Sequence, residues 1–147
     1  MRFALTLLLS VFAAAQTTSD PWPQSDLVEP ESLAKRVTES NAPMIISVAF
    51  PVLYKSRHIL HALDAGAASK PEGIAALKKL VEKTPSDAEI VIYCGCCPMN
   101  KCPNVRPAYQ TLKELGFKRI RVLNVPTNMH TDWYTKNYPS EPPAAEK

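Results

Sequence analysis

Residues 90–105 of this 147-residue chain read IVIYCGCCPMNKCPNV. The first four are large and mainly aliphatic, as in a short strand that is buried on both faces of a parallel sheet. The loop that follows holds all the cysteines of the chain, Cys94, Cys96, Cys97 and Cys102. From Asn104 onward apolar residues return at helical spacing, and Gly116 stands where a helix commonly ends. The segment therefore predicts a strand, a cysteine-rich loop and a helix capped by Asn104.

The same alternation extends to both sides of this segment. Apolar runs predict strands at residues 44–50 and 119–125. Amphipathic patterns predict two helices, one that begins near Pro30 and one that covers residues 71–83. Alternating strands and helices predict an α/β fold, with a central parallel sheet flanked by helices on both faces. Ligands of such folds bind at the carboxyl ends of the strands, and Cys94 follows one of these ends.

The two ends of the chain differ from this pattern. Residues 1–15 combine Arg2 with an apolar stretch that ends in small residues, which predicts a secretory signal peptide. The stretch is shorter than the roughly 20 residues that cross a membrane, so we expect an exported protein, periplasmic or secreted, that leaves the membrane after cleavage. Residues 16–24 are expected to form a linker, or an edge segment packed by Trp22. Residues 140–147 are expected to be a disordered tail, which leaves one domain at residues 25–139.

The charge balance bears on possible partners. The chain has 17 Lys and Arg against 14 Asp and Glu, and these residues are scattered along the sequence. Nucleic-acid binding requires a clustered basic face, so we expect no nucleic-acid partner.

The cysteine loop is the strongest candidate for a chemical site. Four cysteines within nine residues cannot hold distant loops together as a disulfide scaffold does. A thiol at the start of a helix faces unpaired N–H groups, and Lys101 and Arg106 add positive charge nearby. These features predict that the pKa of Cys94 is lowered and that its thiolate is a nucleophile.

Several short segments resemble the rhodanese-like family. They are the Tyr-Cys pair that closes the strand at Cys94, residues 54–59 (similar to the family's Tyr-x-x-Gly-His-Ile), residues 115–117, residues 132–133 and residues 138–139. Their order covers most of the chain beyond the signal peptide. The resemblance implies a rhodanese-like fold and a sulfurtransferase that needs no organic cofactor. In that family the loop amides cradle a sulfur carried on the cysteine, which implies that Cys94 forms a persulfide.

The chain also departs from the family. The loop is about five residues longer and carries three additional cysteines, Ser47 replaces a frequent Asp, and Leu60 and His61 replace the usual Pro-Gly pair. Phosphatases of this fold require Cys-x5-Arg, whereas positions 100 and 103 are Asn and Pro. Phosphatase activity is therefore not expected.

The expected site combines catalytic and substrate-binding residues. One further loop thiol would attack the Cys94 persulfide, release sulfide and leave a disulfide. The adjacent pair Cys96 and Cys97 would form a strained ring, which favours Cys102 as the disulfide partner of either. The partners would be a small sulfur-donor anion and a thiol acceptor, including a protein thiol. We expect substrate contacts from Gly95, Lys101, Asn104, Arg106 and His58.

Two other functions remain open at this stage. Four thiolates could bind Zn(II) or Cu(I), although the C-x-C-C-x4-C spacing differs from the separated pairs of structural zinc sites. Alternatively, a disulfide could staple the long loop of a binding module that has no catalytic activity.

Overall fold

A five-stranded parallel sheet forms the centre of the protein in the computed structural model, which describes residues 20–142. The predicted signal peptide lies outside the described residues. In spatial order the strands are β1 (Leu27–Val28), β6 (Arg119–Leu123), β5 (Glu89–Tyr93), β2 (Met44–Ser47) and β4 (Leu63–Asp64). A separate antiparallel pair consists of β3 (His58–Ile59) and β7 (Ser140–Glu141).

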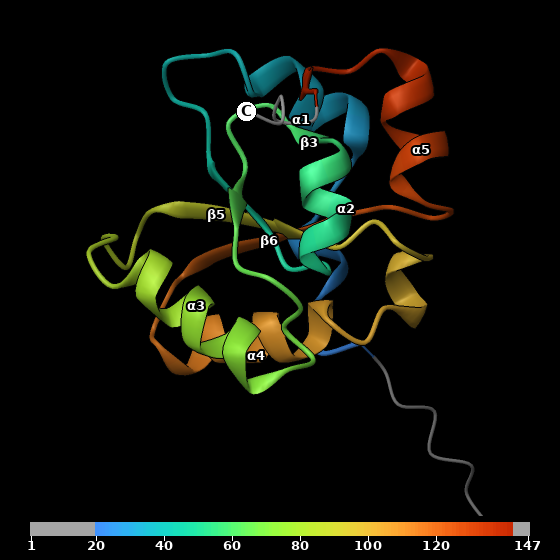
Figure 1. Cartoon of the computed structure of the whole chain (residues 1–147). Helices are drawn as coiled ribbons and strands as arrows, with labels where there is room; N and C mark the ends of the chain where they lie inside the picture. The colour runs from blue at the N-terminus through green and yellow to red at the C-terminus, as the bar shows by residue number, and fades with distance from the viewer. Residues whose placement is uncertain (1–19, 143–147) are drawn as a thin grey trace, which may run out of the picture.

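Helices cover the sheet on both faces. Figure 1 shows α3 and α4 side by side below the central strands, with α1 and α5 on the opposite side. The helices are α1 (Pro30–Arg36), α2 (Pro51–Ser56), α3 (Pro71–Val81), α4 (Val105–Glu114) and α5 (Met129–Asp132). Three short 3-10 turns are η1 (Gln24–Asp26), η2 (Met99–Lys101) and η3 (Tyr134–Lys136). The α/β fold predicted from the sequence is confirmed.

Local sequence explains where the helices begin and end. The helices α1, α2 and α3 each start with proline, whose missing N–H would have no partner in the first helical turn. Helix α4 ends just before Gly116, which adopts a φ of 86° that other residues rarely tolerate. Strand β5 reads as expected for a central strand, because four of its five residues are buried.

The observed boundaries correct several predictions. The strand predicted at residues 44–50 ends at Ser47, and α2, which was not predicted, begins at Pro51. Asn104 starts α4 without capping it, since its side chain forms no cap hydrogen bond.

Both ends of the described chain pack on the domain. Ser140 and Glu141 pair with β3, so the prediction of a disordered tail is wrong for these two residues, while residues 143–147 lie outside the described range. At the other end, Trp22 is buried and packs edge-on against Tyr109 with ring centroids 5.7 Å apart. Of the two expectations for residues 16–24, the described residues 20–24 fit an edge segment packed by Trp22.

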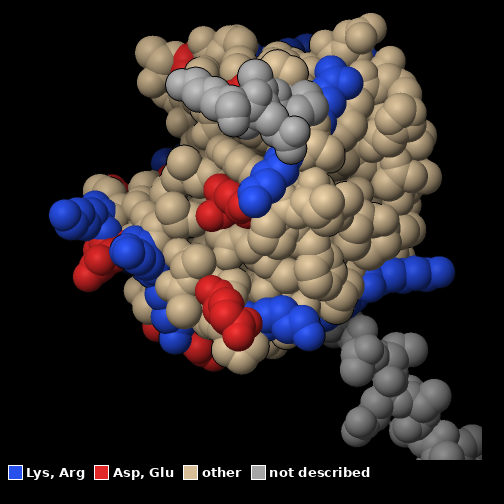
Figure 2. Space-filling view, viewed as in Figure 1, with Lys and Arg blue, Asp and Glu red and all other residues tan. Residues whose placement is uncertain are grey.

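Charged side chains are mixed on the surface. Figure 2 shows basic and acidic groups interspersed with uncharged residues on this face of the molecule. Among residues 20–142, no helix is both long and apolar enough to span a bilayer.

An ion-pair cluster ties one end of the sheet to α1. Glu89, the first residue of β5, accepts two hydrogen bonds from the guanidinium of Arg36, both at 2.9 Å. Arg119, its neighbour on β6, donates a third at 2.9 Å. The hydrogen bonds from Arg36, followed by its charge and that of Arg119, hold the pKa of Glu89 below its ordinary value.

This cluster predicts a pH-dependent contribution to stability. A carboxylate whose pKa is lowered in the folded state stabilises the fold above its unfolded pKa of 4.5, and this contribution is lost as the pH falls through the lower folded value. Glu89→Gln should reduce the free energy of unfolding at neutral pH by about 1 kcal/mol. Urea unfolding should show that the difference in free energy of unfolding between Glu89→Gln and wild type becomes smaller below pH 4.5. A gap that stays constant into acid would contradict this account.

Candidate active site

The cysteine loop is fastened to the end of the sheet at several points. Tyr93, the last residue of β5, accepts a hydrogen bond from Val48 N–H at 2.8 Å. Beyond it, the carbonyl of Gly95 accepts from the N–H of Met129 at 3.2 Å, and Met99 N–H donates to the carbonyl of Val125 at 2.8 Å. These bonds connect the loop to α5 and to the segment that follows β6, so Cys94 has a fixed position.

The loop gathers its sulfur atoms into a cluster. The Sγ atoms of Cys94, Cys96 and Cys102 all lie within 4.8 Å of one another, and Cys94 Sγ is 3.4 Å from Cys96 Sγ. Cys97 Sγ lies 3.3 Å from Cys96 Sγ but is outside this group of three. Cys94 and Cys102 are buried, whereas Cys96 is exposed. All four are free thiols in this structure.

Asn104 connects Cys94 to the rest of the fold. Its Nδ2 donates to Cys94 Sγ at 3.3 Å, and its Oδ1 accepts from the N–H of Ser69 at 2.9 Å. The side chain is fully buried. Asn104 therefore orients the Cys94 sulfur in place of capping the helix.

The prediction of a lowered pKa at Cys94 is wrong for this structure. Hydrogen bonding with the neighbouring Cys102 thiol and burial of the side chain raise the pKa of Cys94. The hydrogen bonds from Asn104 and from the backbone of Cys96 act in the opposite direction but do not overcome these effects. Burial raises the pKa of Cys97 to about 11. A thiolate in a buried site is costly, and this cost outweighs the effects of helix position and nearby charge that favour it.

Lys101 and Arg106, which were expected to favour the Cys94 thiolate, make their contacts elsewhere. Arg106 bonds to the carboxylate of Asp20 and to the carbonyls of Asn100 and Cys102, the last at 3.2 Å. These contacts hold the loop against the start of the described chain. Lys101 is exposed in η2. Neither lines the cavity over Cys94 that is described below.

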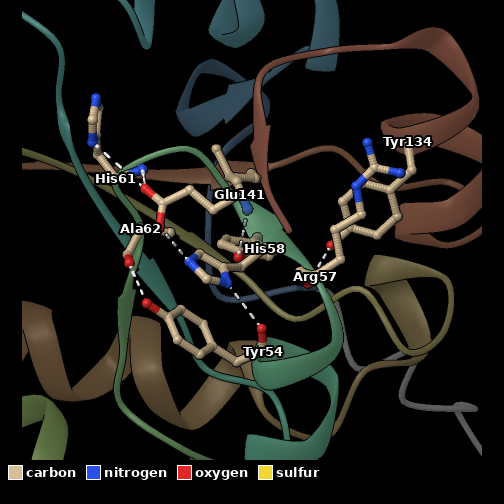
Figure 3. Close-up of polar contacts among 9 residues, drawn as sticks. Tyr54, Arg57, His58, His61, Ala62, Tyr134 and Glu141 are labelled. Atoms are coloured by element: carbon tan, nitrogen blue, oxygen red, sulfur yellow. Dashed lines mark hydrogen bonds and ion pairs between the residues drawn. The ribbon is translucent and has the colours of Figure 1, made fainter. Parts of the chain in front are cut away.

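His58 also belongs to a different cluster. Its Nε2 lies 3.1 Å from Glu141 Oε2 and its Nδ1 lies 2.9 Å from the carbonyl of Tyr54. Figure 3 shows the imidazole held between these two partners, with His61 on the other carboxylate oxygen. His58 therefore fastens β7 to the domain and is absent from the residues that line the Cys94 cavity.

A cavity of about 530 Å³ opens over Cys94. Its wall includes Gly95 and Cys96 from the loop, and two basic residues that the sequence analysis did not select, Arg57 and His130. The guanidinium of Arg57 lies 4.7 Å from the centre of the Tyr134 ring. In the resemblance to Tyr-x-x-Gly-His-Ile, Arg57 stands where the family has glycine. That substitution was the available sequence signal for a cation at the cavity.

Comparison with known proteins now identifies the family. The model of the rhodanese-like domain matches residues 29–125, which is more than half of the chain. The chain belongs to the rhodanese-like domain family. No curated protein matches this rhodanese-like domain.

Solved structures support the same fold. An NMR structure of a rhodanese-like domain from Anabaena sp. is 18% identical, with a TM-score of 0.58 over 83% of this chain and 87% of the other. A crystal structure of the same Anabaena protein gives 17% identity and a TM-score of 0.59, with 78% and 91% covered. EanB, which has been solved in complex with hercynine, is 20% identical with a TM-score of 0.56 over 78% of this chain but only 27% of EanB.

Gly95 offers a direct test of the loop geometry. It adopts a φ of 87°, and a Cβ at this position would lie 2.1 Å from Cγ of Met129. Gly95→Ala should therefore lower the free energy of unfolding by roughly 2–4 kcal/mol, through backbone strain plus overpacking. Gly116→Ala is the matched control, because Gly116 has a φ of 86° but nothing within 4 Å of the added Cβ.

The control should lose only the strain energy, about 1–2 kcal/mol. Urea unfolding of both variants provides the comparison. Equal losses would show that Met129 does not pack against the loop as described.

Proposed function

We propose that this rhodanese-like domain is a sulfurtransferase that carries sulfane sulfur as a persulfide on Cys94. The observation that carries the proposal is a cysteine at the end of the central strand that opens into a cavity lined by Arg57, with a second thiol 3.4 Å away. Family membership supports the reaction class, and the site supports an anionic donor and a thiol acceptor.

The first step is sulfur capture. The Cys94 thiolate attacks the outer sulfur of an anionic donor such as thiosulfate, an S–S bond forms, and sulfite leaves with the electron pair of the broken bond. Asn104 donates a hydrogen bond to Cys94 Sγ and positions it for this attack. Release of sulfite leaves one additional sulfur atom on Cys94.

The second step uses Cys96. Its thiolate attacks Cys94 Sγ, a Cys94–Cys96 disulfide forms, and the outer sulfur leaves as sulfide. Cys96 fits this role better than Cys102, which the sequence favoured as a disulfide partner, because Cys96 is exposed and lines the cavity whereas Cys102 is fully buried. Two external thiols, or a dithiol protein, then reduce the disulfide through attack at Cys96 and are themselves oxidised.

Arg57 supports an anionic donor. It is exposed at the cavity wall, and none of the ion pairs within residues 20–142 involves it. Its guanidinium is therefore available for a sulfonate or carboxylate, which it can bind with two parallel hydrogen bonds.

Cysteine variants separate the two steps. With thiosulfate as donor and a small thiol as acceptor, Cys94→Ser should abolish both sulfite and sulfide production. Cys96→Ser should still release one sulfite per protein in a first turnover but should slow sulfide release by roughly 10–100-fold, the range expected when a positioned group is lost. Cys97→Ser, which changes a thiol outside the group of three, is the control for each measurement. Sulfur transfer by Cys94→Ser would refute the proposed function.

Removing the cavity cation should weaken donor binding. Arg57→Gln should raise the KM for thiosulfate by about tenfold, equivalent to roughly 1.4 kcal/mol of lost interaction. Lys55→Gln is the matched control, because it removes a positive charge from the same segment at a residue that does not line the cavity. Equal effects of the two substitutions would indicate general electrostatic attraction in place of a specific contact.

A further inference from the structure

Three of the loop thiols converge in a manner that sulfur transfer does not require. The proposed reaction uses Cys94 and Cys96, yet Cys102 also brings its sulfur within 4.8 Å of both. Cys102 is fully buried and does not line the cavity. Its position therefore needs an explanation beyond the two-thiol reaction.

We infer that Cys94, Cys96 and Cys102 bind one Cu(I) ion as a three-thiolate site. Metal–thiolate bonds of about 2.3 Å to one central ion place three sulfur atoms roughly 4 Å apart. The observed limit of 4.8 Å requires only small shifts to reach this arrangement. On binding, three S–H groups release their protons to water, three Cu–S bonds form, and copper stays in the same oxidation state.

The donor set favours Cu(I) over Zn(II). Structural zinc sites are almost always four-coordinate, and the remaining thiol, Cys97, lies outside the group of three. Soft sulfur ligands select Cu(I), which is stable with three thiolates. Within the described residues, the group contains no histidine or carboxylate that would complete a zinc site.

Burial and exposure are divided among the ligands in a useful way. Cys94 and Cys102 are buried, so the fold holds both sulfur atoms in place before the ion binds and shields the bound ion from water. The exposed Cys96 gives an incoming ion access. A bound ion would occupy the sulfur lone pairs of Cys94 and Cys96. Copper would therefore inhibit sulfur transfer, a consequence that, unlike the copper site itself, rests on the proposed function.

A competition titration tests the copper site. Reduced full-length protein is mixed without oxygen with Cu(I) held by the coloured chelator bicinchoninate, and the loss of chelator absorbance reports transfer. Wild type should remove one Cu(I) per chain. Cys94→Ser, Cys96→Ser and Cys102→Ser should each weaken binding by roughly a hundredfold or more, since even groups behind a ligand contribute 10–100-fold.

Cys97→Ser is the matched control and should bind within about threefold of wild type, the scatter expected for a residue that is not a ligand. If Cys102→Ser fails to fold, the exposed Cys96 still provides the test, and thermal melting identifies which variants are folded. Any of three results would overturn the three-thiolate copper site. Cys97→Ser could lose as much Cu(I) affinity as the other variants, or Cys96→Ser could bind Cu(I) as tightly as wild type. The protein could also bind Zn(II) more tightly than Cu(I) and need all four thiols to do so.

The same protein separates this inference from the proposed function. One Cu(I) bound by a protein that transfers no sulfur in its metal-free form would support the copper site and refute the sulfurtransferase. Sulfur transfer that continues unchanged with one Cu(I) bound would refute the shared use of Cys94 and Cys96.

Discussion

The position of Cys94 depends on one constraint, the burial of β5 between two parallel neighbours. β5 pairs with β2 on one edge and β6 on the other, and its last four residues are buried. A strand held on both edges cannot shift its register without breaking two ladders. Cys94 therefore leaves the sheet at a defined point, and the rest of the site is arranged around it.

The loop that follows places several thiols in a small volume. Burial disfavours the thiolate of Cys94, and its neighbour Cys102 adds to this effect. Two hydrogen bonds act in the opposite direction, one from Asn104 and one from the backbone of Cys96. A cluster that is costly to ionise without a partner is well suited to accept either an electrophilic sulfur or a soft cation, because both form bonds to sulfur directly.

Local patterns in the sequence predicted the three central strands β2, β5 and β6, the helices α1, α3 and α4, and the place of Cys94, because these depend on hydrophobic periodicity and strand ends. At the site, the errors concern contacts between distant parts of the chain. Arg106 was expected near the nucleophile, but its carboxylate partner is Asp20, 86 positions away, and His58 bonds to Glu141, 83 positions away. Spacing alone likewise could not rank the thiols, since the path of the loop brings Cys96 into the cavity and turns Cys102 into the core.

Mass spectrometry of the reduced, metal-free protein after incubation with thiosulfate examines the nucleophile itself. The account predicts a gain of about 32 Da, one sulfur atom on a thiolate, before an acceptor is added. Tandem fragmentation should assign that sulfur to Cys94 and not to Cys96. The absence of added sulfur, or its attachment to another cysteine while Cys94 stays unmodified, would contradict the assignment of Cys94 as the sulfur carrier.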